Sequence, residues 1–270
     1  MKSRFCLTVL AIVIVLVSCS QGRKMAGRFV KQNRNTVVAL YLPGGLVKQN
    51  LREDNMPSEL EEATLEEQIE YMEGLIKVVN KIDDDQFLDV LYKNMKETLE
   101  DYGLTVKYWE DEYAEADSAH WIINVPRIEV CEVNETQEFC EWIYSHRFCT
   151  DMPVDLVNVA AWFEFYNGPT SSMAFTEQNY FDNIDVSFVV DYEANRVYAK
   201  TYCDTISING FYGFASYLGK LYAGYCYDFL MNKYIDNHQD EPIDTINRYR
   251  YDPYERYFYR TDRDYLIEIK

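Results

Sequence analysis

Two kinds of hydrophobic repeat divide the chain into helical and extended segments. Between Pro57 and Tyr102, apolar residues recur every three or four positions, which predicts two amphipathic helices. Asp83 to Asp85 separate these helices and supply N-cap candidates for the second, which Gly103 closes. The same period predicts a long helix from about Phe211 to Asp236.

Elsewhere the apolar residues alternate with polar ones, which is typical of β-strands. The predicted strands are Thr36 to Leu42, Leu104 to Trp109, His120 to Val133, Asp155 to Tyr166, Ile184 to Tyr192 and Val197 to Ile208, with a short last one at Tyr265 to Ile269. Asp155 to Tyr166 is the clearest of them. The set expected to face the core is Val157, Val159, Ala161, Phe163 and Phe165.

This order of segments predicts an α+β fold, in which a helical pair and one long C-terminal helix cover a mostly antiparallel sheet. The long helix carries a stripe of small residues beside a stripe of bulky ones. The small stripe consists of Ala215, Gly219, Ala223 and Cys226. Because small side chains let a helix lie close against a sheet, packing explains this stripe without a ligand.

The N-terminus has the pattern of an export signal. Lys2 and Arg4 precede the apolar run from Phe5 to Val17, which as a helix spans roughly 20 Å and is too short for a ~30 Å hydrocarbon core. That length suits the apolar region of a signal peptide. The run leads into Leu16-Val17-Ser18-Cys19, which resembles the lipobox of bacterial lipoproteins.

The lipobox resemblance implies that residues 1–18 are a signal peptide and that the mature chain begins at a lipidated Cys19. In that family the Cys thiol receives a diacylglycerol and the new amino group is acylated, with fatty acids such as palmitate. Ser20 follows in place of the Asp that retains such proteins in the inner membrane, which implies the outer membrane. No acidic run follows Cys19, which favours the periplasmic face. An ordinary secreted protein or an uncleaved anchor helix is the alternative.

Residues 19–35 are predicted to be a lipidated basic tether. They contain five basic residues and no acidic one: Arg23, Lys24, Arg28, Lys31 and Arg34. Extended, such a segment reaches at most about 50 Å. Its charges would be attracted to anionic headgroups, although a plain soluble linker is also consistent with the sequence.

Beyond the tether we expect an α+β domain over residues 36–238 and a Tyr/Arg-rich tail over 239–270. From Thr36 onward there are 19 basic and 45 acidic residues, so we expect this body to be repelled from an anionic membrane and held off it. Across all 270 residues the formal net charge is −19, which excludes a general nucleic-acid binder because such a protein needs a basic face. The hydrophobic fraction of 48% is that of an ordinary globular protein.

Catalytic chemistry is not evident in the sequence. The chain has three histidines and lacks the HExxH, CxxC, GxSxG and P-loop motifs, so we assign no catalytic residue, metal ligand or cofactor. Cys140, His146 and Cys149 lie near one another, with Cys131 nine residues before Cys140, but their spacing matches no known zinc pattern. A disulfide in this segment or buried thiols are the preferred interpretations.

With Cys6 removed and Cys19 acylated, five cysteines remain: Cys131, Cys140, Cys149, Cys203 and Cys226. Five is odd, so at least one stays unpaired or pairs between chains. A Cys203–Cys226 disulfide and a reduced contact between these two residues both remain open.

The tail offers a candidate interaction surface, because tyrosine and arginine are enriched where proteins meet. Its members are Tyr249, Tyr251, Tyr254, Tyr257, Arg250 and Arg256. The alternative is that the tail wraps around the domain and buries its rings.

The chain has too many acidic residues for the sequence to single out a carboxylate pair for glycoside hydrolysis. One set is nevertheless worth testing. Glu164 lies beside Trp162 on one strand face, and we expect Asp191 and Tyr192 nearby. The simpler interpretation is that Glu164 is a solvent-facing residue of the strand.

Three short Asp-Ser/Thr-apolar segments resemble the O-glycosylation acceptor of one group of two-membrane bacteria, with Ser118, Thr205 and Thr245 as the modified residues.

These observations predict a lipid-anchored, periplasm-facing outer-membrane protein that acts as a non-catalytic accessory or binding component of an envelope assembly or transport system. Its expected partners are the outer membrane and an envelope protein, with no nucleic acid. The alternative is a lipoprotein that binds a glycan or hydrolyses one weakly.

Overall fold

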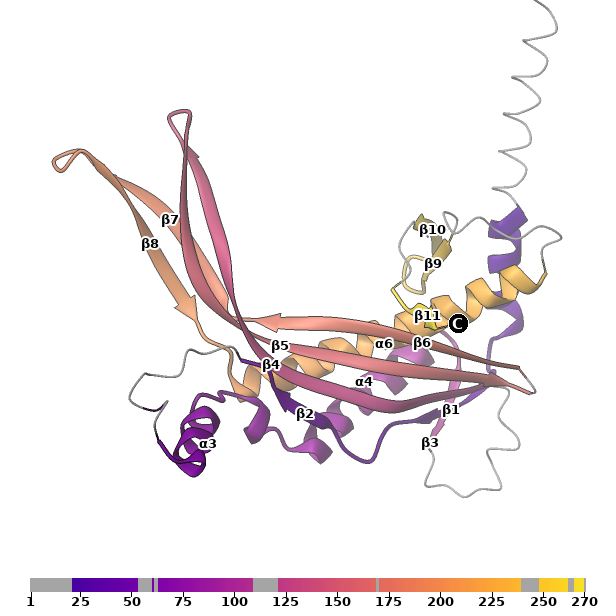
Figure 1. Cartoon of the computed structure of the whole chain (residues 1–270). Helices are drawn as coiled ribbons and strands as arrows, with labels where there is room; N and C mark the ends of the chain where they lie inside the picture. Colours follow the sequence, from indigo (N-terminus) through magenta and orange to yellow (C-terminus); the bar gives the residue numbers. More distant parts are fainter. Residues whose placement is uncertain are drawn as a thin grey trace, which may run out of the picture.

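The computed structural model describes residues 21–52, 60, 63–108, 121–168, 170–238, 248–261 and 265–269. Its strands and helices, shown in Figure 1, are β1 (Val37–Tyr41), β2 (Val47–Asn50), α3 (Leu65–Gly74), η1 (Val79–Lys81), α4 (Asp84–Asp101), β3 (Thr105–Tyr108), β4 (Trp121–Ile143), β5 (His146–Asn167), β6 (Thr170–Phe181), β7 (Asn183–Asp191), β8 (Arg196–Asp204), α6 (Ile208–Asn237), β9 (Arg248–Asp252), β10 (Tyr257–Thr261) and β11 (Ile267–Ile269). Residues 21–32 form a further helix at the start of the described chain.

The main sheet is mixed, so the expectation of a mostly antiparallel sheet is wrong. Among the described residues it has seven strands in the order β11-β6-β5-β4-β1-β3, with β2 alongside β4. β4, β5, β6 and β11 pair antiparallel, but β1 runs parallel to β3 and β4, and β2 runs parallel to β4. The chain passes through α3 and α4 between β1 and β3, and such a crossover returns a strand in the same direction.

The long helix is not C-terminal, contrary to the prediction. After α6 the chain forms the β9–β10 hairpin and then β11, which adds to the edge of the main sheet beside β6. The prediction also omitted β6, which pairs with β5 from Thr170 to Phe181. Within β6 only Ala174 and Thr176 are buried, so this strand lacks the run of alternating large buried residues that marks β5.

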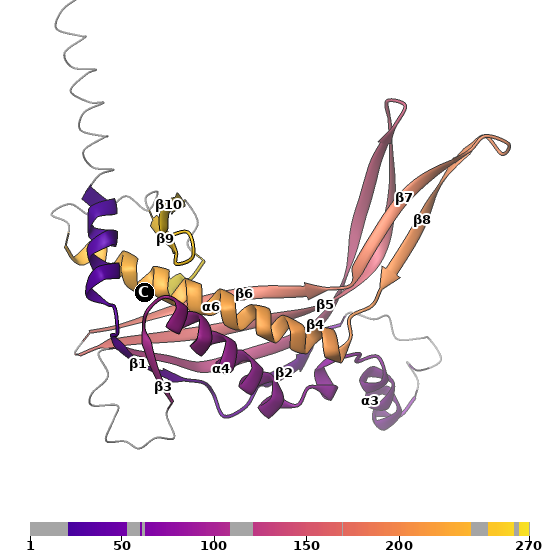
Figure 2. The same cartoon turned by 180° about the vertical axis from the view of Figure 1, so that it is seen from behind.

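α4 and α6 lie side by side on one face of the sheet, as Figure 2 shows from behind. The predicted inward set of β5, from Val157 to Phe165, is buried as expected. Phe163 meets Tyr222 of α6 edge-on with ring centroids 5.4 Å apart, and Phe165 stacks on Phe229 at 4.4 Å. Such aromatic pairs add about 0.5–1.5 kcal/mol beyond the burial of their area. The bulky residues of α6 therefore fill the core above β5.

The start and end of α4 also follow the prediction. The carboxylate of Asp83 accepts a hydrogen bond from the N–H of Gln86, which caps the first turn. Gly103 follows the helix with a φ of 90°, a left-handed conformation that glycine adopts without steric cost.

Gly219 of the small stripe of α6 serves a close approach to α4, whereas we expected the stripe to lie against the sheet. A Cβ added to Gly219 would lie 2.6 Å from the carbonyl oxygen of Leu91 and 2.7 Å from the Cβ of Asn94. The Ser216 hydroxyl donates a hydrogen bond to the same Asn94 side chain at 2.9 Å. The two helix backbones are therefore in contact at Gly219.

Gly219→Ala is expected to lower the free energy of unfolding by about 1–3 kcal/mol, because the backbone of α4 has to move away. Gly213→Ala is the matched control, since Gly213 is exposed on the same helix and nothing lies within 4 Å of the position that its Cβ would take. That change is expected to stabilise by up to about 1 kcal/mol through helix propensity. Urea unfolding followed by circular dichroism measures both, and the same effect from both would contradict the contact.

Most of the segment that was predicted to be a tether forms a helix. Residues 21–32 form a helix whose Met25, Ala26 and Phe29 are buried in the main core. Phe29 contacts Tyr227 and Tyr234 of α6 with ring centroids 5.5 and 5.6 Å away. The basic residues hid this amphipathic pattern, because they occupy the opposite side of the helix. Only Ser20 then separates Cys19 from Gln21, the first described residue of this helix.

Candidate functional site

Two β-hairpin arms project from one end of the sheet (Figure 1). β4 and β5 remain paired as far as Ile143 and His146, whereas the neighbouring β2 ends opposite Glu132 and β6 ends opposite Leu156. Residues 134–154 therefore form a two-stranded ribbon, the β4–β5 arm. β7 and β8 pair only with each other among the described residues and form the β7–β8 arm, residues 183–204.

The boundaries of the β4–β5 arm coincide with the limits of the predicted strands. The strands were expected to end at Val133 and to begin again at Asp155, and the ribbon continues unbroken between them. Because most of its residues are exposed, the arm has no need of the apolar alternation that marks a strand in a packed sheet. The sequence signal that it does retain is a cluster of aromatic residues.

The arms turn half-buried apolar side chains toward each other. Phe148 and Phe188 approach with ring centroids 6.4 Å apart, and the N–H of Phe188 donates to the Glu141 carboxylate at 3.2 Å. At the tips, the hydroxyls of Tyr144 and Tyr192 lie 3.0 Å apart. These contacts place the ribbons side by side and leave part of the apolar surface accessible.

Large aromatic side chains are exposed on both arms. Trp142 is 70% exposed, and the tip residues Tyr144 and Tyr192 are 75% and 76% exposed. Tyr198 and Tyr202 of β8 are exposed as well. Burial of such rings is favourable and they dominate the centres of protein interfaces, so their exposure together indicates a surface for a partner. We take the paired arms as the candidate functional site.

A disulfide joins the strands of the β4–β5 arm. Cys140 and Cys149 are directly opposite each other in the ladder and are bonded, which confirms the disulfide expected in this segment. Glu138 lies beside them, but sulfur atoms bonded to each other are not thiolate metal ligands. His146 is exposed at the end of the arm. The bond restrains the outer half of the ribbon, nearer to its tip than to its base.

The other described cysteines are free thiols. Cys131 and Cys226 are buried, and Cys203 is exposed near the base of the β7–β8 arm. Cys203 and Cys226 are therefore not joined by a disulfide. Burial raises the pKa of the Cys226 thiol, which suits a packing role.

A buried carboxylate anchors the base of the β4–β5 arm. Glu132 is fully buried on β4, and its two oxygens accept hydrogen bonds from the backbone N–H groups of Lys77, Val78 and Val79 at 2.7, 2.9 and 3.1 Å. The guanidinium of Arg52 lies 3.3 Å from the same carboxylate. Glu132 thus ties the strand to the start of η1.

Two aspartates extend this cluster to β5 and to the β7–β8 arm. Asp155 pairs with Arg52 at 2.8 Å and with Lys77. Asp182, just before β7, accepts hydrogen bonds from the N–H groups of Asp155 and Ile206 at 3.1 and 2.7 Å. The bases of both arms are therefore held together by one polar network. Sequence reasoning missed it, although a charged Glu132 in phase with buried Ile128 and Val130 was a signal.

The predicted tail surface is only partly a surface. Tyr249 is buried, Tyr251 is half-buried, and Arg250 forms an ion pair with Asp228 of α6 at 3.1 Å. Tyr254, Tyr257 and Arg256 are exposed on the β9–β10 hairpin. The alternative, that the tail wraps around the domain and buries its rings, therefore holds for about half of the predicted surface residues.

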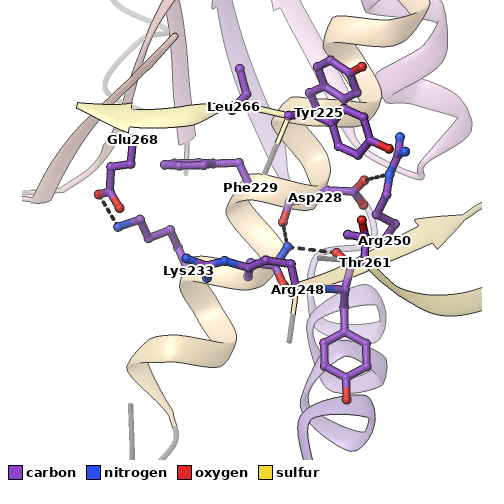
Figure 3. Close-up of a pocket in the computed structure, with 12 residues that line it drawn as sticks. Tyr225, Asp228, Phe229, Lys233, Arg248, Arg250, Thr261, Leu266 and Glu268 are labelled. Atoms are coloured by element: carbon purple, nitrogen blue, oxygen red, sulfur yellow. Dashed lines mark hydrogen bonds and ion pairs between the residues drawn. The ribbon is translucent and has the colours of Figure 1, made fainter. Parts of the chain in front are cut away.

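A cavity of about 40 Å³ lies where this tail meets α6, and Figure 3 shows its lining. The space is sufficient for little more than water. Its charged groups are engaged with one another or with neighbours: Lys233 pairs with Glu268, and Arg248 pairs with Asp236 at 2.8 Å. The arrangement explains how the tail docks, and it does not define a ligand site.

Burial raises the pKa of Asp228 to about 7, despite the opposing effects of the Tyr251 N–H and Arg250. The folded chain then binds this proton more tightly than the unfolded chain, whose aspartate titrates near 3.8. The resulting stabilisation is complete below about pH 4 and is lost as the pH rises to about 7. Relative to Asp228→Asn, the wild-type unfolding free energy should fall by at most about 4 kcal/mol over this range. Urea unfolding of both chains at several pH values measures this, and a constant difference would contradict it.

The set proposed around Glu164 is not brought together. The Glu164 carboxylate accepts hydrogen bonds from the Asn124 amide and the Tyr166 hydroxyl, both at 2.8 Å, within the main sheet. Asp191 and Tyr192 lie instead at the tip of the β7–β8 arm. Trp162 is half-buried against Phe175, with ring centroids 5.0 Å apart.

The remaining predicted sites lie largely outside the described residues. Cys19, Ser118 and Thr245 belong to segments that the structure does not describe. Thr205 is exposed in the link between β8 and α6, where a modifying enzyme would have access. Its glycosylation stays a prediction.

Comparison with models of known protein families gives no match for this chain, and comparison with curated proteins gives none either. Within the described part of the chain, none of the helices has the length and apolarity needed to cross a membrane.

Proposed function

We propose that this protein is a lipid-anchored, periplasm-facing outer-membrane lipoprotein that serves as a non-catalytic accessory or binding component of an envelope assembly or transport system. The single observation that carries the binding role is the pair of arms with exposed Trp142, Tyr144 and Tyr192. The anchor rests on the Leu16-Val17-Ser18-Cys19 segment and its resemblance to a lipobox.

The arrangement of the two ends supports this role. Helix 21–32 and the arms lie toward opposite ends of the main sheet (Figures 1 and 2). The part of β5 between the arm and its last residue, from Asp155 to Asn167, spans about 40 Å at the usual rise of a strand. An anchor at one end therefore leaves the arms accessible to a partner at a distance from the attachment point.

Restraint of the arms further supports a binding role. The Cys140–Cys149 disulfide restrains one ribbon, and the network around Glu132 and Asp182 fixes both bases. A surface that is ordered before binding loses less conformational entropy when it meets a partner. A catalytic role has less support, because the Glu164 carboxylate is engaged by Asn124 and Tyr166.

The anchor and the arms are tested separately on protein from native membranes. Intact mass spectrometry of the chain and of Cys19→Ala is expected to find an N-terminal Cys19 with acyl mass, lost in the variant. A photo-reactive residue in place of Tyr144 is expected to cross-link a discrete envelope protein, and one in place of Tyr217, exposed on α6, is not. No cross-link from Tyr144, together with retention of the chain on a polysaccharide, would favour the glycan-binding alternative.

A further inference from the structure

Helix 21–32 presents a basic side to solvent. Its buried residues are Gly22, Met25, Ala26 and Phe29. Its exposed basic residues are Arg23, Lys24, Arg28 and Lys31, with Arg34 just after the helix. At about 100° per residue, the buried and basic sets centre on opposite sides of the helix. One side is therefore packed against the body and the other carries the positive charge.

These five basic residues form no ion pair with any residue that the structure describes. The chain has 45 acidic residues, yet the ion pairs of the described part use other lysines and arginines. Arg23 lies over the ring of Tyr257, 5.2 Å from its centroid, and keeps its charge accessible. The basic side is thus available to an anionic partner.

The basic side is held in a fixed position. Phe29 packs against Tyr227 and Tyr234, and the Tyr234 hydroxyl donates to the Gln32 side chain at 2.9 Å. A Cβ on Gly22 would lie 2.8 Å from the ring of Tyr249, so the first turn lies directly on β9. A flexible tether would spread its charges, whereas this helix presents them on one face of the folded body.

The sequence places this helix next to a membrane. Gln21 comes two residues after Cys19 and four after the end of the apolar run at Val17. Two residues span at most about 7 Å, which is less than the Debye length of about 10 Å at 0.1 M salt. The first turns of the helix therefore lie within electrostatic range of the headgroups to which the chain is attached.

We propose that the solvent-facing side of helix 21–32 binds anionic phospholipid headgroups and so sets the orientation of the body on the membrane. This inference rests on the proposed function, because the lipid anchor at Cys19 is what brings the helix close to the membrane. The partner follows from charge complementarity: the helix is positive, while the chain from Thr36 onward is strongly acidic and is repelled by the same surface. Only one face of the molecule can then approach the bilayer, in contrast to a body held off by a loose tether.

The test uses the full chain reconstituted into vesicles. Its lysines are labelled with an acylating reagent, and mass spectrometry measures the labelling rate of each lysine. Lys24 and Lys31 report on the basic side, and Lys200, exposed on the β7–β8 arm, is the internal control. In vesicles containing phosphatidylglycerol, labelling of Lys24 and Lys31 is expected to be at least about fivefold slower than in pure phosphatidylcholine. The difference should vanish in 1 M salt, where the Debye length is about 3 Å, and Lys200 should label equally throughout.

Arg28→Glu supplies the matched variant, because Arg28 is exposed and its change should leave the thermal unfolding temperature unaltered. It is expected to abolish the protection of Lys24 and Lys31. Equal labelling rates of Lys24 and Lys31 in the two vesicle types overturn the proposal. This holds also where both rates are lower than that of Lys200, since the shielding would then come from the anchor alone. Acyl mass at Cys19 and cross-links from Tyr144 are read independently, so failure of the proposed function is distinguishable from failure of this inference.

Discussion

Replacing Glu132 with alanine is expected to lower the free energy of unfolding by about 3–5 kcal/mol. The change removes acceptors for the N–H groups of Lys77, Val78 and Val79, and it leaves them in a site from which water is excluded. It also takes the Glu132 carboxylate away from Arg52, whose side chain is almost fully buried. Because these groups join β4 to η1, the base of the arms should loosen as well.

Urea unfolding followed by circular dichroism measures the effect of Glu132→Ala. Glu135→Ala is the matched control, since Glu135 is exposed three residues farther along the same strand, and its change should stay within about 0.5 kcal/mol. Glu132→Gln keeps one carbonyl acceptor and should lie between the two. If Glu132→Ala is as stable as the control, the carboxylate does not hold the network at the base of the arms.

Trp142→Ala is expected to weaken binding of the protein cross-linked through Tyr144 by at least about 30-fold, or about 2 kcal/mol. The reason is that a large exposed ring on a restrained ribbon is the kind of side chain that dominates an interface. Since the side chain is 70% exposed, its removal should change the free energy of unfolding by no more than about 0.5 kcal/mol. This variant should therefore lose affinity for the partner while its free energy of unfolding stays nearly unchanged.

The binding measurement compares dissociation constants of the purified partner for wild type, Trp142→Ala and Tyr217→Ala. Tyr217 is an exposed aromatic residue of α6, away from the arms, and its loss should leave the affinity unchanged. An equal loss in both variants would indicate nonspecific adhesion of aromatic rings. Full affinity in Trp142→Ala would place the binding surface elsewhere than on this face of the β4–β5 arm.

Local patterns were sufficient for much of the secondary structure. The alternation from Asp155 to Tyr166 identified the buried side of β5, since a strand exposes alternate residues to opposite faces. Asp83 caps α4 as expected, because a cap involves residues only a few positions apart. The Cys140–Cys149 disulfide was likewise anticipated as one of a few alternatives in a short segment.

The functional surfaces were less predictable because they are made of residues far apart in the chain. The Glu132 network joins residues 52, 77–79, 132, 155 and 182. The β4–β5 arm was missed because a two-stranded ribbon whose residues are mostly exposed has no deeply buried face to impose a pattern, whereas the strands of the β7–β8 arm were predicted. Helix 21–32 was missed because its four buried positions, one of them glycine, were outweighed by the basic residues between them.

The sequence by itself determined the charge contrast between residues 19–35 and the body and the buried faces of the longest elements, and it is the basis for predicting an export signal and an anchor at Cys19. Only the tertiary structure decided that β1 pairs in parallel, that Gly219 meets α4 and that the basic segment is docked as a helix. Periodicity records which side of an element is buried, but it does not record what covers that side. The covering partner depends on close packing and hydrogen bonding among segments that meet only in the folded chain.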